Sequence, residues 1–539
     1  MEIESRKYFI VKAYQLTGWN LNCLFRRAIL FFILCTCMLP SFSTAESLPY
    51  EVYHFTATNW YTPIGDSLYF DGQIGFKGDA GTQIGIWKSD GIKNGTRQIS
   101  ANILSRDVPM PHNEKMGDLV FFVADENDNG DNELYVANET DKTNTLIEEF
   151  KEPLFSRTIW TAKVYKNNFF FQAHTFSEGM ELWRTDGTPH AATLVKDICP
   201  GSCDAEISEV VEFGGNLFFG ANDDSHGREL WVSDGTNAGT LLLRNIYSGA
   251  LAPGDYTTSS SPQDFVIVGN KLLFTANDGI HGRELWSSDP VTIDAGGITS
   301  SNVTMVKDFT PGSDANGQHY SSGISHMITY KNNLYFIVNR DDLDDSTSTE
   351  HWELWRTDGT TTGTVQLGST HDWDNDGVPY EMVAMNDKLF LSINSPAYGY
   401  ELFYVNLLSN DKSLHLLKDI YPGVDTNGYQ HGSSPSLLSV VSGSSLGKKD
   451  LFYFVADSPG YGYELWVSDG TAAGTHLLKD LTPGPDSSQF DEMHVINNKL
   501  FFRLNYYYLW AIDRSYDGAR YGNFPWNMFL PAIIKGGNH

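Results

Sequence analysis

The sequence predicts an all-β protein, a β-propeller of eight or nine four-stranded antiparallel blades. Three observations predict it. The phrase "ELW", or a close variant of it, recurs along the chain. Each copy lies among short segments that are rich in β-branched and aromatic residues and are bounded by turn formers. None of these segments has the length or the period of a helix.

The N-terminal segment predicts a secretory signal peptide over residues 1–45. Arg26 and Arg27 precede an apolar run at residues 28–39, and Ser43 and Ala45 stand at the −3 and −1 positions of a cleavage site before Glu46. Because the apolar run is short for a bilayer span, it favours a cleaved signal peptide over the alternative, an uncleaved anchor. We therefore expect an extracellular, cell-surface or periplasmic protein, with no integral membrane domain after cleavage.

The charge and the cysteines narrow the possible partners. The formal net charge is −30 at pH 7, so the surface should repel nucleic acid and anionic membranes. After cleavage only Cys199 and Cys203 remain, in the stretch "CPGSC". In an oxidising compartment this spacing favours a local disulfide; a zinc site would need more ligands.

A repeat with a base period of 48 residues organises the chain. Aligned on the aromatic residue of "ELW", the units carry Trp87, Tyr135, Trp183, Trp231, Trp286, Trp355, Phe403, Trp466 and Trp510. Such a repeat predicts stacked modules that bury their apolar faces only against neighbours. We assign residues 46–515 to the propeller and 516–539 to a C-terminal tail. The count gives nine blades, or eight if one unit is a degenerate insertion.

Each unit reads as four short strands. Two apolar runs flank a pair such as Asn167–Asn168 or Gly269–Asn270, which tolerates the positive φ of a tight hairpin; the "ELW" segment and a fourth run follow. The last unit lacks a clear fourth strand. We predict that the stretch "YEVYHFTA" at residues 50–57 completes it and closes the ring, which removes most edge strands.

Residues that recur in one slot of every unit are expected to be structural, because a catalytic group is needed only once. The aromatic residue of "ELW" should lie between adjacent blades. Asp-Gly in "SDGT", as at Asp234–Gly235, should form the next turn, with the Asp accepting backbone N–H groups. The Glu of "ELW" should bond locally to backbone or to a basic residue.

The units resemble the ELWxxDGT repeat of exported bacterial proteins, also called hyalin-like, most closely in "ELWVSDGTAAGTHLLKDLTPG" at residues 464–484. The resemblance covers nearly all of the predicted mature chain and implies an extracytoplasmic repeat protein without a settled activity. Some units depart from the pattern: Gly85 replaces the Glu, Asn138 and Asn406 replace the Asp, and no Gly follows Asp513.

Two acidic loops outside the repeated phrase predict calcium sites. Hard oxygen donors on alternate residues, followed by Gly, suit Ca²⁺; solvated acidic turns are the alternative. Neither loop has the twelfth-position Glu of a full EF-hand. The candidate ligands are Asp125, Asn127, Asn129, Asp131 and Glu133 in the first loop, and Asp372, Asp374, Asp376 and Glu381 in the second.

The chain shows no signature of a metalloprotease, a serine hydrolase or a phosphate-binding loop. We therefore expect no catalytic residues. The leading hypothesis is a monomeric binding, adhesion or scaffold module for an extracellular glycan or protein, stabilised by calcium. The alternatives are a quinoprotein-like oxidoreductase, whose tryptophan-docking repeats resemble "ANDGIHGRELW", and an extracellular glycan hydrolase on the same scaffold.

Overall fold

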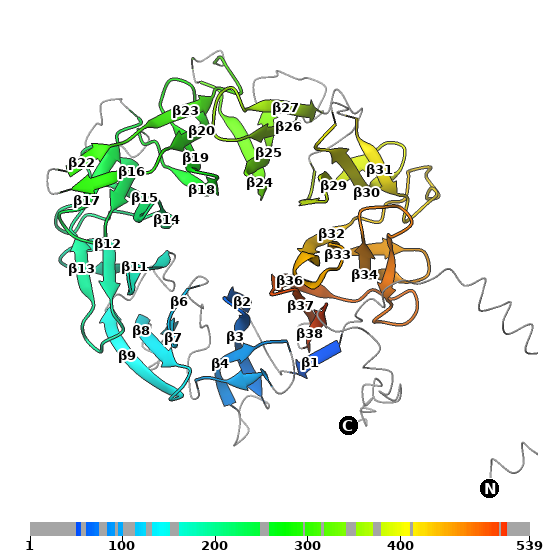
Figure 1. Cartoon of the computed structure of the whole chain (residues 1–539), viewed down its shortest axis with the longest axis horizontal. Coiled ribbons are helices and arrows are strands. Elements are labelled where there is room, and N and C mark those ends of the chain that lie inside the picture. The colour runs from blue at the N-terminus through cyan, green and yellow to red at the C-terminus, as the bar shows by residue number, and fades with distance from the viewer. Residues whose placement is uncertain are drawn as a thin grey trace, which may run out of the picture. The chain divides into compact units, whose positions relative to one another are not determined.

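A computed structural model describes most of the repeat region (Figure 1). The described residues are 50–54, 61–74, 83–91, 95–100, 114–124, 132–150, 161–247, 258–294, 297–313, 317, 319–340, 352–369, 379–409, 413–505 and 508–514. They belong to one compact unit, Leu48–Ser515. Within this part of the chain, no helix has the length and hydropathy that crossing a membrane needs.

The described strands form nine four-stranded antiparallel sheets arranged as a propeller, which confirms the predicted fold class and decides for nine blades (Figure 1). Blade one contains β2 (Tyr61–Ile64), β3 (Ser67–Ile74), β4 (Gln83–Ser89) and β5 (Arg97–Gln98). Blade two contains β6 (Lys115–Met116), β7 (Leu119–Ala124), β8 (Asn132–Asn138) and β9 (Thr143–Phe150). Blade three contains β10 (Ala162–Tyr165), β11 (Asn168–Thr175), β12 (Gly179–Thr185) and β13 (Thr193–Lys196). Blade four contains β14 (Val211–Phe213), β15 (Asn216–Asn222), β16 (Arg228–Ser233) and β17 (Thr240–Arg244).

The second half of the ring repeats this order. Blade five contains β18 (Gln263–Val268), β19 (Lys271–Asn277), β20 (Arg283–Ser288) and β23 (Val303–Lys307), with the inserted hairpin β21 (Thr292–Asp294) and β22 (Gly297–Ser300). Blade six contains β24 (Ser322–Tyr330), β25 (Asn333–Arg340), β26 (Trp352–Thr357) and β27 (Val365–Ser369). Blade seven contains β28 (Met382–Met385), β29 (Lys388–Ser395), β30 (Gly399–Asn406) and β31 (His415–Lys418). Blade eight contains β32 (Ser436–Val441), β33 (Leu451–Ser458), β34 (Gly462–Ser468) and β35 (His476–Lys479).

Blade nine confirms the predicted closure. It contains β36 (Phe490–Ile496), β37 (Lys499–Leu504) and β38 (Tyr508–Asp513), and its fourth strand is β1 (Tyr50–His54) from the other end of the chain. β1 pairs antiparallel with β38, with Glu51 opposite Trp510 and His54 opposite Tyr508. An N-terminal strand therefore supplies the hydrogen bonds that the last repeat lacks.

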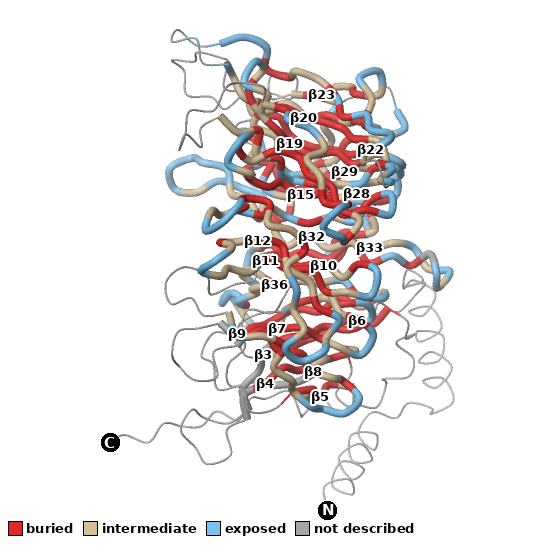
Figure 2. Tube along the Cα trace, turned by 90° about the vertical axis from the view of Figure 1, so that its left-hand side faces the viewer, coloured by how far each residue is buried: buried red, intermediate tan, exposed pale blue. Residues whose placement is uncertain are grey.

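The core is divided into nine apolar clusters, and each lies between two neighbouring blades. One of them joins Phe70 and Trp87 of blade one to Phe501 and Leu509 of blade nine. Figure 2 shows the buried residues concentrated in the strands and the exposed ones in the loops. Since every blade buries its faces against both neighbours, no described blade has a core of its own.

The aromatic residue of "ELW" packs on the preceding blade, as predicted. Trp231 of blade four, for example, joins a cluster with Tyr165 and Phe170 of blade three. In blades two to eight the pairing of the third and fourth strands shifts register between the Leu and the aromatic residue. This repeated β-bulge increases the local twist and re-aims the large ring toward the neighbouring blade.

The "SDGT" segments form the predicted turns, in which the Asp accepts backbone N–H groups. In blade eight Asp469 Oδ1 accepts the N–H of Thr471 at 3.0 Å, and Gly470 has a φ of 85°. The hydroxyls of Ser468 and Thr475 lie 2.8 Å apart behind the turn. A Cβ atom on Gly470 would lie 3.0 Å from Phe390 Cζ of blade seven. The glycine therefore provides both the left-handed backbone and the close approach to the preceding blade.

The Glu of "ELW" bonds to backbone, as predicted, and also reaches the following blade. Glu401 of blade seven is fully buried and accepts the N–H groups of Ile420 (3.1 Å) and Tyr421 (2.9 Å). It also accepts the hydroxyl of Ser433, which lies just before blade eight, at 2.7 Å. We call this arrangement the glutamate clamp. Glu229, Glu284 and Glu464 form it with Ser260, Ser322 and Ser488. Half-buried Glu353 instead lies 3.3 Å from Arg340.

The departures from the repeat have local explanations. At Gly85, which replaces the Glu, an added Cβ would overlap the carbonyl oxygen of Ser100, so no side chain fits there. Asn138 still performs the role of the turn Asp, because its Oδ1 accepts the N–H groups of Thr140 and Asp141. The residue after it, Glu139, replaces the turn Gly and makes ion pairs with Lys88 and Arg97 of blade one.

Candidate ligand-binding face

The connections between strands divide into two sets. Because the strands of a blade alternate in direction, the turn between its second and third strands and the connection to the next blade leave from the same strand ends. We call the surface made by these two sets of segments the loop face. The tight turns between first and second strands, and those between third and fourth strands, lie at the other ends. Long, variable segments gather on the loop face, as binding segments commonly do on a rigid scaffold.

Four exposed tyrosines of the loop face come from blades seven and eight and the connection between them. Tyr398 lies on the second turn of blade seven and Tyr400 at the start of β30. Tyr429 lies on the connection, and Tyr461 lies on the second turn of blade eight. We call these four residues the tyrosine patch. Tyr429 is 73% exposed. Large apolar or amphipathic rings gathered on a soluble surface are typical of interaction sites.

The connection that carries Tyr429 has defined structure. Val424 and Gln430 form a β-bridge. Inside it, Asp425 Oδ1 accepts the N–H groups of Asn427 (2.8 Å) and Tyr429 (2.9 Å), and these backbone bonds lower the pKa of Asp425. The segment is therefore a small ordered hairpin. Because its backbone is already fixed, the segment that carries Tyr429 loses little conformational entropy when a ligand binds.

A stacked pair flanks the hairpin that carries Tyr429. The rings of Tyr421 and His431 lie 4.6 Å apart at an interplanar angle of 16°. The backbone of His431 lies against Gly399, and Ser434 donates its N–H to the carbonyl of Tyr400 at 3.1 Å. These contacts join the connection to the second turn of blade seven, so Tyr398, Tyr400 and Tyr429 are held by one continuous surface.

One ionisable group lies beside this surface. Burial raises the pKa of Asp457, at the end of β33, and the charge of nearby His431 opposes the shift in part. Asp457 donates its N–H to the carbonyl of Ser433 at 2.8 Å. A carboxyl group and an imidazole therefore interact at the connection that carries Tyr429, and such groups can accept and donate hydrogen bonds to a polar ligand.

The structure describes two of the nine residues predicted to bind calcium. Glu133 lies on β8, is buried, and occupies the Glu slot of its repeat. Glu381 Oε1 and Oε2 accept the N–H groups of Leu437 (2.9 Å) and Leu438 (2.7 Å) on the first strand of blade eight. Asp125, Asn127, Asn129, Asp131, Asp372, Asp374 and Asp376 lie outside the described residues. Within the described residues, no three His, Cys, Asp or Glu side chains are grouped to hold a metal ion.

Ionic pairs on the inner strands were not found from the sequence. Arg503 on β37 contacts Asp491 and lies 3.8 Å from Glu492 on β36, and Glu492 lies 3.1 Å from His494. A convergent group of this kind on a first strand could indicate catalysis. However, blade four has a related pair, Glu206 and Arg228. Since a carboxylate at or before the first strand pairs with an arginine from a later strand of the same blade in both cases, we interpret these pairs as structural.

No protein-family model and no curated protein matches the chain. Solved structures similar to it include prolyl oligopeptidase B from Galerina marginata (10% identity, 76% of this chain and 56% of that chain covered, TM-score 0.36). BamB from Moraxella catarrhalis is 9% identical, with 87% of this chain and 98% of that chain covered and a TM-score of 0.34. The GH74 enzyme of Niastella koreensis is 11% identical, with 86% and 71% covered and a TM-score of 0.32.

The aligned region spans little more than half of the peptidase. At these scores the similarities carry no argument about function, and the propeller assignment rests on the strand pairing described above.

Proposed function

We propose that this chain is an exported, monomeric binding module that recognises an extracellular glycan or protein through the tyrosine patch. The observation that carries the proposal is the exposed ring of Tyr429 on an ordered hairpin, in a connection whose backbone contacts the segment of Tyr398 and Tyr400. The resemblance to the exported ELWxxDGT repeat proteins supports the location outside the cytoplasm, and the rigid ring of blades supports a scaffold for presentation.

The chemistry of tyrosine suits both ligand classes. Its ring offers a flat apolar face that can cover the C–H face of a sugar or an apolar side chain, and its hydroxyl can bond to polar groups. Tyrosine has few rotatable bonds, so contacts made by it cost little conformational entropy. The described cavity beside Ile267 and Tyr330 has a volume of about 170 Å³ and lies at the first turns of blades five and six. It is smaller than the roughly 300 Å³ typical of small-molecule sites, so we assign no ligand to this cavity.

Calcium is part of the proposal, and the described contacts refine it. Because both carboxylate oxygens of Glu381 already hold backbone N–H groups, Asp372, Asp374 and Asp376 would supply the ligands of the second site. The loop at 125–131 would supply those of the first, since Glu133 is buried in the repeat slot. Calorimetric titration with Ca²⁺ should release or absorb heat and raise the melting temperature. Absence of both effects removes calcium from the proposal without affecting the tyrosine patch.

The proposed binding is tested with the purified chain on a panel of polysaccharides and surface proteins by biolayer interferometry. Replacing both Tyr429 and Tyr461 by Ala should weaken binding about tenfold or more, as loss of interface aromatics typically does. Leu408→Ala is the matched control, because Leu408 is 82% exposed and follows the third strand of blade seven, at the opposite strand ends. Equal losses in both variants, or release of new reducing ends from a polysaccharide, would contradict the proposal; the second outcome would favour the glycan hydrolase.

A further inference from the structure

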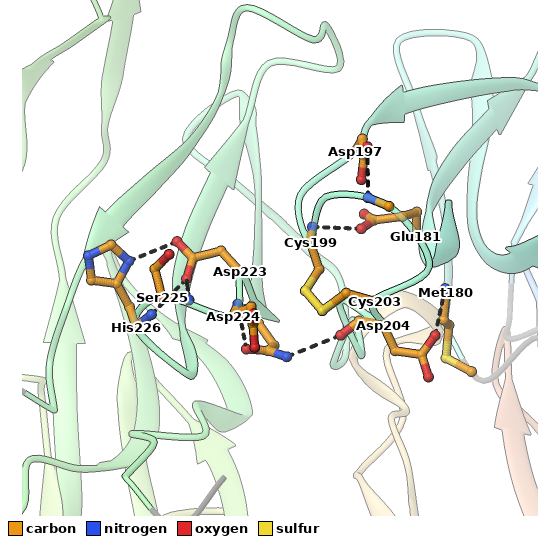
Figure 3. The surroundings of a disulfide bond; sticks show 12 residues. Met180, Glu181, Asp197, Cys199, Cys203, Asp204, Asp223, Asp224, Ser225 and His226 are labelled. Carbon is orange, nitrogen blue, oxygen red and sulfur yellow. Dashed lines mark hydrogen bonds and ion pairs between the residues drawn. A yellow bond between two sulfur atoms is a disulfide. The ribbon is translucent and has the colours of Figure 1, made fainter. Parts of the chain in front are cut away.

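The joint between blades three and four lacks half of the glutamate clamp (Figure 3). Glu181 is fully buried, and its Oε1 accepts the N–H of Cys199 at 2.7 Å. Its Oε2 has no hydrogen-bond partner among the described residues. Burial raises the pKa of Glu181 to about 8, and the backbone N–H groups around this carboxyl group offset the shift only in part.

The missing donor can be identified by comparison with the other joints. Asn222 donates its N–H to the carbonyl of Ala205, as Asn277 does to the carbonyl of Ser260. The next residues, Glu206 and Ser261, both have a positive φ, of 46° and 42°. Ala205 therefore occupies the position of Ser260. Ser433 meets the same two criteria, because it accepts the N–H of Asp457 and Ser434 has a φ of 45°. At all four complete clamps a serine hydroxyl lies 2.6–2.7 Å from the carboxylate.

A disulfide spans the same connection. Cys199, whose N–H binds Glu181, is bonded to Cys203. The next residue, Asp204, accepts the N–H of Met180 at 2.9 Å, and its carbonyl accepts the side-chain amide of Asn222 at 3.2 Å. Figure 3 shows that the sulfur bridge links the start of the connection, beside Glu181, to the end that contacts blade four.

We propose that the Cys199–Cys203 disulfide replaces the serine hydroxyl as the lock of this joint, which makes the connection between blades three and four sensitive to dithiols. Cys203 is half-buried beside the exposed residues Gly201 and Ser202, so a thiolate can reach its sulfur. A dithiol would reduce the bridge by thiol–disulfide exchange: the Cys199–Cys203 S–S bond breaks, both cysteines become thiols, and the reductant forms a cyclic disulfide. Two electrons and two protons pass from the dithiol to the cysteines. The four serine clamps contain no sulfur and stay closed.

The first test uses the unmodified protein. Hydrogen exchange at the backbone amides of Ala205 and Asn222 is compared before and after reduction by dithiothreitol. Loss of a short disulfide loop should accelerate exchange at both amides about tenfold. The amide of Asp457, which binds the carbonyl of Ser433 at a serine clamp, is the internal control and should not change. Unchanged exchange at Ala205, or an equal change at Asp457, overturns the proposal.

The second test restores the clamp. In the variant Cys199→Ser/Cys203→Ser, adding Ala205→Ser should place a hydroxyl at Glu181 Oε2 and return the exchange of Asn222 toward that of the oxidised protein. In the oxidised wild type, Ala205→Ser should change this exchange much less, because the bridge already holds the connection. Equal effects of Ala205→Ser with and without the disulfide would show that bridge and hydroxyl are independent, and would overturn the proposal.

Discussion

The hydroxyl of Ser433 donates a hydrogen bond of 2.7 Å to the buried carboxylate of Glu401 across the joint between blades seven and eight. The two residues are 32 positions apart and belong to consecutive repeats. Each clamp of this kind anchors a connection to the blade that precedes it and to the blade that follows. The repeated glutamate is therefore part of the ring's assembly, and its protonation should influence stability.

Stability should fall as pH rises from about 5 to 8. Burial raises the pKa of Glu229, Glu284 and Glu401 to about 7, against 4.5 without burial. Between these values the folded chain keeps protons that the unfolded chain releases, so the clamps contribute most below about pH 4.5, and the contribution is lost by about pH 7. Urea denaturation midpoints across this range measure the trend. Glu401→Gln should flatten the slope, whereas exposed Glu212→Gln should leave it unchanged; an unaltered slope in Glu401→Gln would contradict the assignment.

Glu139→Gln should destabilise the fold by about 2–3 kcal/mol, somewhat less than the loss of a fully buried pair because its cations are partly solvated. Glu139 lies 2.8 Å from Lys88 and 3.1 Å from Lys115, and both pairs are lost. Burial alone would raise the pKa of Glu139, but hydrogen bonds from Lys88, Tyr69 and Lys115 outweigh it and lower the pKa. The stabilisation of the fold by the ionised Glu139 is thus present above about pH 4.5 and is lost as the pH falls below that value. Glu114→Gln, which removes one pair with Lys163, is the milder control, and an equal loss in both variants would refute this ranking.

Gly470→Ala should cost more than Gly460→Ala. The two glycines have nearly the same φ, 85° and 86°, so both substitutions carry a left-handed penalty of about 1–2 kcal/mol. An added Cβ at Gly460 meets open space, whereas at Gly470 it meets Phe390 Cζ at 3.0 Å. Overpacking of the blade joint should add about 1–3 kcal/mol at Gly470. Thermal unfolding of the two variants compares them, and equal losses would show that the close approach is unimportant.

Trp466→Ala should destabilise the protein by about 3–5 kcal/mol, because it leaves a cavity between blades seven and eight. Tyr461→Ala, an exposed aromatic five residues earlier, should change stability by less than about 0.5 kcal/mol. Chemical denaturation of both variants gives the comparison. Retained stability in Trp466→Ala would refute the idea that the repeated aromatic residue joins neighbouring blades.

Much of the architecture was predictable because its signals are local. Hairpin pairs such as Asn167–Asn168, the Asp-Gly turn at 469–470 and the spacing of the tryptophans lie within one unit of the sequence. The closure by β1 could also be inferred, because the last repeat lacked a fourth strand and the strand-like stretch at residues 50–57 belonged to no repeat. The calcium ligands remain a prediction: seven of the nine lie outside the described residues, and Glu133 and Glu381 are placed in structural contacts.

The tyrosine patch was not predicted, because Tyr398 and Tyr461 stand in a repeated slot of "YGYEL" that was interpreted as structural, and Tyr429 lies on a connection outside the repeat. The same holds for Glu139, which replaces a turn glycine and pairs with Lys88 and Arg97 of the preceding blade.

The sequence by itself determined the class of fold, the repeat, the turn chemistry and the buried face of each strand, because these depend on residues only a few positions apart. The tertiary structure decided which groups meet across the joints: the serine of each clamp, the cations around Glu139 and the open carboxyl of Glu181 beside the disulfide. Such pairs are separated by tens of residues, and their proximity exists only once neighbouring blades pack together.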